Sequence, residues 1–356
     1  MMRFTLFAAF MASSALAEHT HTTVTNLEEG MHGLELMGRF NAWMNKFEKT
    51  YDAHHEFQQR LNNWLSNNAQ IEEHNSKEST VVLGHNSYSD MTQDEFHIFF
   101  KLGPHSENKP REDLRSADTV ERQTFDSVTP LTLPDYTNWV QMGGVTPVKN
   151  QGSCGSCWAF STTGALEGAK FIKTGELVSL SEQNLLDCDH ADMGCNGGLM
   201  DNAFKFDEKS GGLCSETDYP YEARQGKVCK TDCTDVPGSI VKTFIDVPPG
   251  DEKALLSAIA MQPISIAIEA SGFVFQFYKT GVITDDSCGR NANIDHGVLA
   301  VGYGTDLETQ SPYFLVKNSW GDTWGSDGYV KLGRGSKNQF GVCAILKMAS
   351  FPVTDA

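Results

Sequence analysis

The sequence predicts an α+β protein in which a helical half is followed by a strand-rich half and preceded by a small helical domain. Three observations lead to this class. Apolar residues recur at helical spacing in the N-terminal part, an apolar helix follows at Cys157–Lys173, and short β-prone runs begin at Ile264. The chain has 356 residues, which is room for two or three compact units with sizeable cores.

Two amphipathic helices are expected in the N-terminal part, one over Leu36–Lys49 and one over His55–Asn75. Each repeats large apolar residues every three or four positions, the spacing that places them on one helix face. The repeating residues are Phe40, Trp43 and Phe47 in the first helix, and Phe57, Leu61, Trp64 and Ile71 in the second.

The segment from Cys157 onward changes from helical to strand-rich character. Residues Cys157–Lys173 are apolar or small on nearly every face, as expected of a helix buried in a core. Further on, short β-prone runs separated by Gly, Asp and Asn predict an antiparallel sheet or barrel. These runs are Ile264–Ile268, Val298–Tyr303, Tyr313–Val316 and Gly328–Leu332.

Composition and charge exclude several classes of partner. Apolar residues make up 40% of the chain and charged residues 21%, as is ordinary for a globular protein. The 46 acidic residues exceed the 28 basic ones and give a net charge of -18. This is the wrong sign for binding a phosphate backbone or an anionic membrane surface. We therefore expect neither nucleic acid nor a membrane as a partner.

The first 17 residues have the layout of a secretory signal peptide. Arg3 precedes the apolar run Phe4–Leu16, and Ala15-Leu16-Ala17 resembles a cleavage site. The run is shorter than the roughly 20 apolar residues that span a bilayer. We expect a cut after Ala17 and entry into the secretory pathway, with the lysosome, the vacuole or the extracellular space as destination.

Histidines and cysteines divide the remaining chain into two segments. Nine of the 11 histidines precede residue 110, whereas all nine cysteines lie from Cys154 onward. Between them, the polar stretch Glu107–Leu133 is flanked by prolines and is typical of a linker. An odd number of cysteines in an oxidising compartment suggests four bridges and one free thiol.

The motif Cys154-Gly155-Ser156-Cys157 opens the predicted buried helix and fits three kinds of chemistry. A redox pair is expected near a βαβ pattern, which we do not find. A zinc site requires a second pair of ligands at short spacing, and the other cysteines are scattered. In the third interpretation Cys157 is a nucleophile, because the positive end of a helix dipole favours its thiolate.

A cysteine nucleophile needs a base, and only His190 and His296 lie outside the N-terminal segment. His190 lies in a polar loop and is most simply a solvated surface residue. His296 immediately precedes a predicted strand, and Asn318 follows another one. A cysteine, a histidine and an asparagine can form a nucleophile, its base and the group that orients the base, while Trp320 could shield them from water.

Several motifs follow one another in a characteristic order. The longest covers residues 145–161, which include Gln151 and Cys157. After it come Cys195-Asn196-Gly197-Gly198, Asp295-His296-Gly297 and Asn318-Ser319-Trp320-Gly321. Two further motifs in the N-terminal segment consist of Glu56, Arg60, Trp64, Asn67, Ile71 and Asn75, and of Gly84, Asn86, Tyr88 and Asp90.

With these motifs the chain resembles the papain family of cysteine proteases, in its cathepsin L-like group, with a pro-region attached. The resemblance implies a papain-like two-domain fold, with a helical half holding Cys157, an antiparallel β-barrel-like half holding His296 and a cleft between them. It implies a signal peptide over residues 1–17, an inhibitory helical pro-region with linker over 18–132, and a mature peptidase domain over 133–356.

The resemblance also implies the roles of individual residues. Cys157 is the expected nucleophile, His296 the base, Asn318 the residue that orients it, and Gln151 a donor to the oxyanion. The mature domain is expected to prefer a hydrophobic P2 residue. The implied substrate-binding residues are Gly197, Gly198, Leu199, Met200, Ala267, Ile294, Gly297, Trp320 and Met348.

A pattern of disulfide bridges is implied as well. The family's common bridges correspond to Cys154 with Cys195, Cys188 with Cys229, and Cys288 with Cys343. These leave Cys214 with Cys233 as an additional pair and Cys157 as the free thiol.

The function we expect is that of a cysteine endopeptidase zymogen, which acts through an acyl-enzyme without metal or cofactor. Expected partners are peptide and protein substrates, its own pro-region as an intramolecular inhibitor, and cystatin-like inhibitors, with the enzyme a monomer. The clustered histidines suggest that charging them below about pH 6.5 loosens the pro-region. Two alternatives stay open, a catalytically silent peptide-binding relative and a thiol-disulfide oxidoreductase that uses Cys154 and Cys157.

Overall fold

The structure is a computed structural model, which describes residues 32–99, 125, 132–226, 228–284, 288 and 293–355. The predicted signal peptide and most of the predicted linker lie outside these residues. The chain divides into two compact units, residues 1–69 and 70–356. In the described ranges, no helix is long and apolar enough to cross a membrane.

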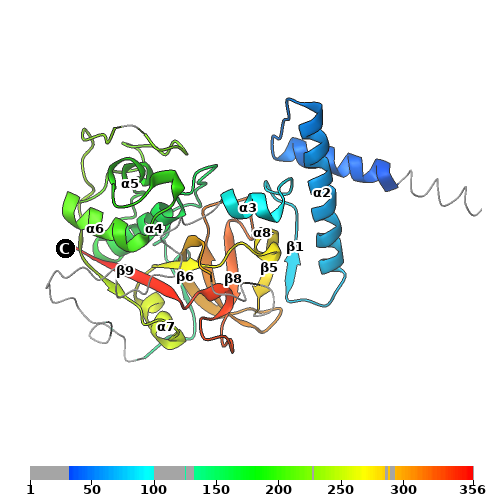
Figure 1. Cartoon of the computed structure of the whole chain (residues 1–356). Coiled ribbons are helices and arrows are strands. Elements are labelled where there is room, and N and C mark those ends of the chain that lie inside the picture. Colours follow the sequence, from blue (N-terminus) through cyan, green and yellow to red (C-terminus); the bar gives the residue numbers. More distant parts are fainter. Residues whose placement is uncertain are drawn as a thin grey trace, which may run out of the picture. The chain divides into compact units, whose positions relative to one another are not determined.

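The elements follow one another along the chain as Figure 1 shows. A helix covers residues 32–46 of the described chain. The helices after it are α2 (His54–Asn75), α3 (Gln93–Phe99), α4 (Cys157–Thr174), α5 (Glu182–Cys188), α6 (Met200–Ser210), α7 (Glu252–Met261) and α8 (Phe273–Gln276), with the 3₁₀ turns η4 (Gly194–Asn196) and η6 (Val342–Ala344). The strands are β1 (Val81–Leu83), β2 (Thr137–Asn138), β3 (Val241–Asp246), β4 (Ile264–Ile268), β5 (Tyr278–Ile283), β6 (His296–Thr305), β7 (Pro312–Lys317), β8 (Tyr329–Gly333) and β9 (Met348–Thr354).

The N-terminal unit contains the first predicted amphipathic helix and most of the second, α2, which ends at Asn75 in the next unit. Phe40 and Trp43 of the first helix pack against Leu61 and Trp64 of α2 in a small aromatic core. The first helix ends at residue 46, three residues before the predicted end. The reason is a turn in which Glu48 has a φ of 52°, a left-handed conformation that does not continue a helix.

The helical half of the second unit is built around α4, which is buried along most of its length. Its apolar and small residues pack in one core with residues from α5 and α6. Ser181 caps α5 by accepting a hydrogen bond from the Asn184 backbone N–H, which satisfies an otherwise unpaired donor. Gly175 ends α4 in the left-handed conformation that glycine adopts most easily.

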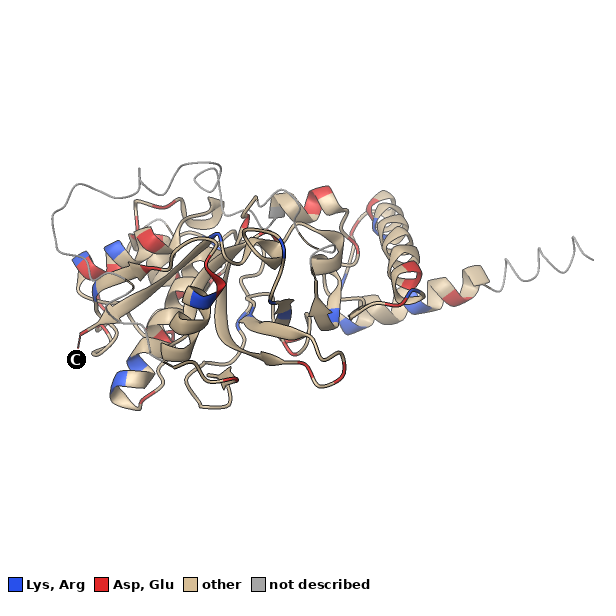
Figure 2. Ribbon diagram, turned by 90° about the horizontal axis from the view of Figure 1, so that it is seen from below, with Lys and Arg blue, Asp and Glu red and all other residues tan. Residues whose placement is uncertain are grey.

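The strand-rich half contains a sheet with the order β1-β5-β8-β7-β6-β4-β9-β3 in the described chain. All four predicted strands are present, and the α+β class is confirmed. The strand predicted from Val298 begins at His296, so this histidine is the first residue of β6 and does not precede the strand. Acidic and basic positions are interspersed over the described elements (Figure 2), and none of these elements is basic throughout.

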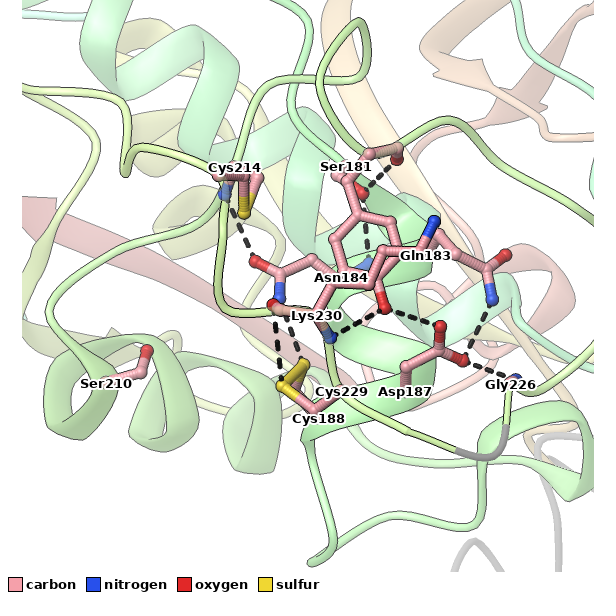
Figure 3. Close-up of a disulfide and its surroundings, with 12 residues drawn as sticks. Ser181, Gln183, Asn184, Asp187, Cys188, Ser210, Cys214, Gly226, Cys229 and Lys230 are labelled. Atoms are coloured by element: carbon pink, nitrogen blue, oxygen red, sulfur yellow. Dashed lines mark hydrogen bonds between the residues drawn. A yellow bond between two sulfur atoms is a disulfide. The ribbon is translucent and has the colours of Figure 1, made fainter.

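Four disulfide bridges stabilise the second unit, and they join Cys154 to Cys195, Cys188 to Cys229, Cys214 to Cys233 and Cys288 to Cys343. Figure 3 shows the surroundings of the second bridge. The Asn184 side chain donates to the Cys188 sulfur at 3.2 Å and accepts from the Cys214 backbone N–H at 3.1 Å. One buried amide of α5 therefore links two of the bridges.

A buried cluster of charged side chains connects the two halves of this unit. Lys149 Nζ lies 2.6 Å from Glu182 Oε1 and 3.1 Å from Glu167 Oε1. Glu167 also accepts from Thr146, which in turn accepts from Lys317 at the end of β7. Burial alone would lower the pKa of Lys149, but attraction to both carboxylates outweighs it and raises that pKa.

Replacing Lys149 by Met should destabilise the fold strongly. Removing one partner of a buried ion pair costs about 3 to 5 kcal/mol, because an uncompensated charge stays buried. The free energy of unfolding in urea measures this, with Cys157→Ala in all proteins to prevent self-cleavage. The matched control is Lys253→Met, since Lys253 is exposed on α7. Equal stability of the two variants would contradict the role of the cluster.

Candidate active site

Three segments that are distant in sequence meet at one end of α4. The antiparallel register pairs Leu299 of β6 with Lys317 of β7, so the start of β6 lies beside the residues that follow β7. This places His296 next to Asn318. At the start of β6, a Cβ on Gly297 would lie 3.2 Å from the backbone oxygen of Cys157. The first residue of α4 therefore contacts the strand that carries His296.

The imidazole of His296 is oriented by Asn318. His296 Nε2 lies 2.7 Å from Asn318 Oδ1, which also accepts from the Ser319 backbone N–H at 2.8 Å. A carbonyl oxygen cannot donate, so with this amide orientation Nε2 carries the hydrogen. In the neutral ring Nδ1 then holds the lone pair, and it is the nitrogen that could exchange a proton with Cys157.

The site is shielded from water by Trp320. Its ring stacks on His296 with centroids 4.6 Å apart and an interplanar angle of 24°. His296 is fully buried, and burial lowers its pKa to about 4, partly offset by the Asn318 hydrogen bond. In this state the imidazole is neutral over the whole range above about pH 5.

Cys157 is the first residue of α4 and the free cysteine of the described chain. Burial raises the pKa of its thiol to about 12, although backbone N–H groups including that of Gly297 favour the thiolate. The helix N-terminus acts in the same direction as those N–H groups. Both reactive groups are therefore neutral in this structure because of desolvation.

Gln151 is buried beside the start of α4. Its Nε2 donates to the Cys154 carbonyl at 2.9 Å, and its Oε1 accepts from Ser319 Oγ at 2.7 Å. Its backbone N–H donates to the Ser319 carbonyl. The predicted oxyanion donor is thus bound to the residue that follows Asn318.

Five of the predicted substrate-binding residues lie in one apolar cluster, whereas Trp320 belongs to the other core of this unit. The five are Leu199, Met200, Ala267, Ile294 and Met348. In the sheet, Ala267 of β4 pairs with Gly297 on one side and with Met348 of β9 on the other. A Cβ on Gly297 would also lie 3.3 Å from the Met200 sulfur. The register of the sheet and the packing of the cluster thus bring the predicted substrate-binding residues beside β6, the strand that begins with His296.

Gly197 and Gly198 form the segment that leads into this cluster. Gly197 has a φ of 110°, a conformation that favours glycine. At Gly198 a Cβ would lie 2.6 Å from the Trp158 ring and 2.7 Å from the Asp192 carboxyl carbon. Close approach of these two side chains requires glycine at this position.

The segment of the N-terminal region after α2 packs against the same site. Strand β1 pairs with β5, and Asn86 Nδ2 donates to the Gln276 carbonyl at 2.6 Å. Tyr88 and Phe96 pack edge-on against Trp320 with centroids 5.8 and 5.1 Å away. The ring that stacks on His296 is therefore covered by residues of the predicted pro-region.

His97 contributes a further contact, because its Nδ1 lies 3.6 Å from Asp295 Oδ2. Charging His97 in acid would make this contact an ion pair and strengthen it. This is opposite in sign to the acid-induced loosening that the histidine cluster suggested, so His97 does not explain such loosening.

The motifs of the sequence do not indicate the buried cluster formed by Lys149, Glu167, Glu182 and Lys317. A signal was available, since Glu167 interrupts an otherwise apolar buried helix and a buried carboxylate requires a partner. His190 is exposed, as predicted. Among the described residues, no group of three or more His, Cys, Asp and Glu side chains could hold a metal ion.

Comparison with known proteins shows the family of the chain. Residues 133–353 match the family described as papain family cysteine protease, and residues 40–96 match the cathepsin propeptide inhibitor domain. A cysteine protease of Arabidopsis thaliana is 42% identical over 349 residues, which cover 98% of this chain and 95% of the relative. A cathepsin L-like peptidase of Aedes aegypti is 43% identical over 321 residues, with 88% and 92% covered.

A crystal structure of the proform of Amb a 11, a cysteine protease and ragweed pollen allergen, has a TM-score of 0.78 and 36% identity. The match covers 90% of this chain and 94% of that one. The chain belongs to the papain family of cysteine proteases and has the family's proform fold. It is a cysteine-type endopeptidase zymogen with a cathepsin-type propeptide.

Replacing Asn86 by Ala should weaken the hold of the propeptide. The variant loses the buried bond to the Gln276 carbonyl, which keeps only the Trp324 Nε1 donor, and it removes the Oδ1 acceptor of the Tyr88 backbone N–H. We expect a cost of about 1 to 3 kcal/mol. The rate of conversion to active enzyme at a fixed acid pH should rise roughly 5- to 150-fold. The matched control is Asn62→Ala, at an exposed position of α2. If both variants convert at the wild-type rate, Asn86 does not anchor the propeptide.

Proposed function

We propose that Cys157, His296 and Asn318 form the catalytic site of this protease. The observation that carries the proposal is the Nε2 hydrogen bond to Asn318 Oδ1, since it leaves Nδ1 as the proton-accepting nitrogen beside α4. His296 takes the Cys157 proton, and the thiolate attacks the peptide carbonyl. The imidazolium then protonates the leaving amine, which departs as a thioester forms.

Water completes the reaction. His296 Nδ1 removes a proton from a water molecule, which attacks the thioester carbonyl and releases the acid and the Cys157 thiol. Gln151 has a second Nε2 hydrogen beyond the one given to Cys154 and would donate it to the oxyanion, together with the Cys157 backbone N–H. Loss of one such donor typically costs about 3 kcal/mol of transition-state stabilisation.

The propeptide keeps this chemistry switched off. Burial raises the pKa of the Cys157 thiol and lowers that of the His296 imidazole, and both shifts disfavour the ion pair of the two groups in the proform. Removal of the residues that cover Trp320 would admit water and reduce both desolvation effects. The thiolate-imidazolium pair then becomes accessible near neutral pH. The signal-like N-terminus supports a secretory route for the zymogen.

The alternatives have less support. Cys154 is bonded to Cys195, so it is not available for a redox pair with Cys157. A catalytically silent relative that only binds peptides would have no use for the complete catalytic set, yet the chain contains all of it. The set is Cys157, Gln151, His296 and Asn318.

Labelling of Cys157 by a thiol-directed epoxide tests the proposal. The acid-activated enzyme should cleave a peptide library and lose this activity as one epoxide per chain is added, with the label at Cys157 by peptide mass. A Cys157→Ser variant matured by the active enzyme is the control and should take no label. Cleavage that persists after complete labelling would refute the proposed nucleophile.

Substrate selection is proposed to depend on the apolar cluster that contains Met200 and Met348. A charged P2 side chain would be desolvated there without a partner, at a cost of several kcal/mol. A P2 Leu, Phe or Val would gain about 1.5 to 3 kcal/mol from burial. The flexible methionines could adapt to the shape of the ligand.

Replacing Met348 by Glu should reverse part of this preference. Met348 is buried in β9, so a carboxylate here would find its counter-ion in a P2 Arg. The measurement is the ratio of kcat/KM for P2 Arg and P2 Leu substrates, which should rise at least about tenfold, or 1.4 kcal/mol. Met348→Gln is the uncharged control. An unchanged ratio in a folded variant would show that Met348 does not line the P2 pocket.

A further inference from the structure

Two buried carboxylates lie in the loop between α5 and η4, outside the catalytic site. Asp189 is 2% and Asp192 6% exposed. Their Oδ1 atoms are satisfied, since Asp189 accepts from the Ala191 N–H at 2.9 Å and Asp192 from the Leu199 N–H at 3.0 Å. Within the described chain, both Oδ2 atoms are buried and have no hydrogen-bond donor.

The two residues are three positions apart in one loop, and a side-chain hydrogen bond between their carboxyl groups contributes to the pKa of each. Buried like charges at this distance cannot both be ionised at low cost, so one of the two groups keeps a proton and donates it to the other. A shared proton satisfies both Oδ2 atoms at once. Burial raises the pKa of Asp189, and burial also raises that of Asp192 to about 8.

Asp192 is directly attached to the proposed substrate-binding segment. Its Oδ1 accepts from the backbone of Leu199 and from the Asn202 side chain, both at 3.0 Å. The Gly198 backbone packs so closely on this carboxyl group that a Cβ would clash with it. A displacement of Asp192 would therefore displace the segment that carries Gly198 and Leu199.

We propose that one proton shared by Asp189 and Asp192 holds residues 197–200 in their substrate-binding position, which makes Asp192 a positioning residue for the P2 pocket. The inference rests on the proposed function of this segment. When the proton is lost, repulsion between two carboxylates moves Asp192 and its bond to Leu199. Peptide affinity then falls as the pH rises.

The charges around the pair do not replace this proton. On the same loop, His190 is exposed and favours ionisation of Asp189. On α6, Lys205 and Lys209 line the same surface hollow as Asp189 and His190. Asn202 of α6 is neutral. The pKa of both carboxyl groups is raised although these cations are near, so attraction to the cations does not outweigh burial.

The sign of the pH effect follows from the raised pKa values. Above the ordinary aspartate pKa of about 4, the folded chain holds a proton that the unfolded chain releases. Folding stability that depends on this pair is thus present in acid and is lost as the pH rises through the raised pKa.

Asp192→Asn removes the repulsion, because an amide can still accept from Leu199 and can donate to Asp189. The test compares KM and kcat of the acid-activated wild type and this variant for one P2 Leu peptide between about pH 5.5 and pH 8.5. Effects of the catalytic groups on pH dependence are common to both proteins and cancel in the ratio. We expect the wild-type KM divided by the variant KM to be near one in acid and to rise about five- to tenfold at alkaline pH, with a kcat ratio near one.

Asp189→Asn should give the same KM ratio as Asp192→Asn, and it replaces Asp192→Asn in the test if that variant folds poorly. Asp218→Asn, at an exposed position, should match the wild type at every pH. A KM ratio that does not change with pH in either amide variant would overturn the proposal.

Asp192→Ala separates this failure from failure of the proposed function. It removes the acceptor for Leu199 and should raise KM at every pH. If KM rises in Asp192→Ala but the amide variants show no pH effect, the segment binds substrate and the shared proton does not control it. If KM is unchanged in Asp192→Ala as well, the segment does not belong to the P2 pocket.

Discussion

The hydrogen bond between His296 Nε2 and Asn318 Oδ1 is the interaction on which the rest of the site depends. It fixes the ring nitrogen that carries the hydrogen, and so decides which nitrogen would act as the base in the proposed mechanism. The bond exists because the register of β6 and β7 brings the first residue of one strand beside the residue that follows the other. The Lys317 ammonium, just before Asn318, is held in the buried charged cluster. The same sheet that forms the core therefore sets the chemistry of the imidazole.

Two layers of aromatic side chains keep this arrangement dry in the proform. Trp320 covers His296, and the propeptide residues Tyr88 and Phe96 cover Trp320. In this dry environment desolvation outweighs both the helix dipole at Cys157 and the hydrogen bond at His296. Desolvation in the proform therefore favours the neutral thiol and the neutral imidazole.

The sequence was sufficient for the parts of the fold that have a strong local signal. The buried helix α4 and strands β4, β6, β7 and β8 were predicted from apolar patterning, because a continuous apolar run has few alternatives. Strands such as β1 and β3 were missed, since their pairing partners are distant in sequence and only the folded sheet selects them. The proton shared by Asp189 and Asp192 could not be predicted either, because it depends on burial that two aspartates in a polar loop do not reveal.

The most direct test of this account is the protonation state of His296 in the zymogen. Nitrogen NMR of the full chain, labelled with ¹⁵N at histidine and carrying Cys157→Ala against self-cleavage, reports both ring nitrogens, and the His296 signals are identified by their loss in His296→Gln. We expect a hydrogen on Nε2 and none on Nδ1 from about pH 8 down to pH 5.5, with protonation of Nδ1 only as the pH approaches about 4. An imidazolium at pH 6 in the zymogen would contradict it.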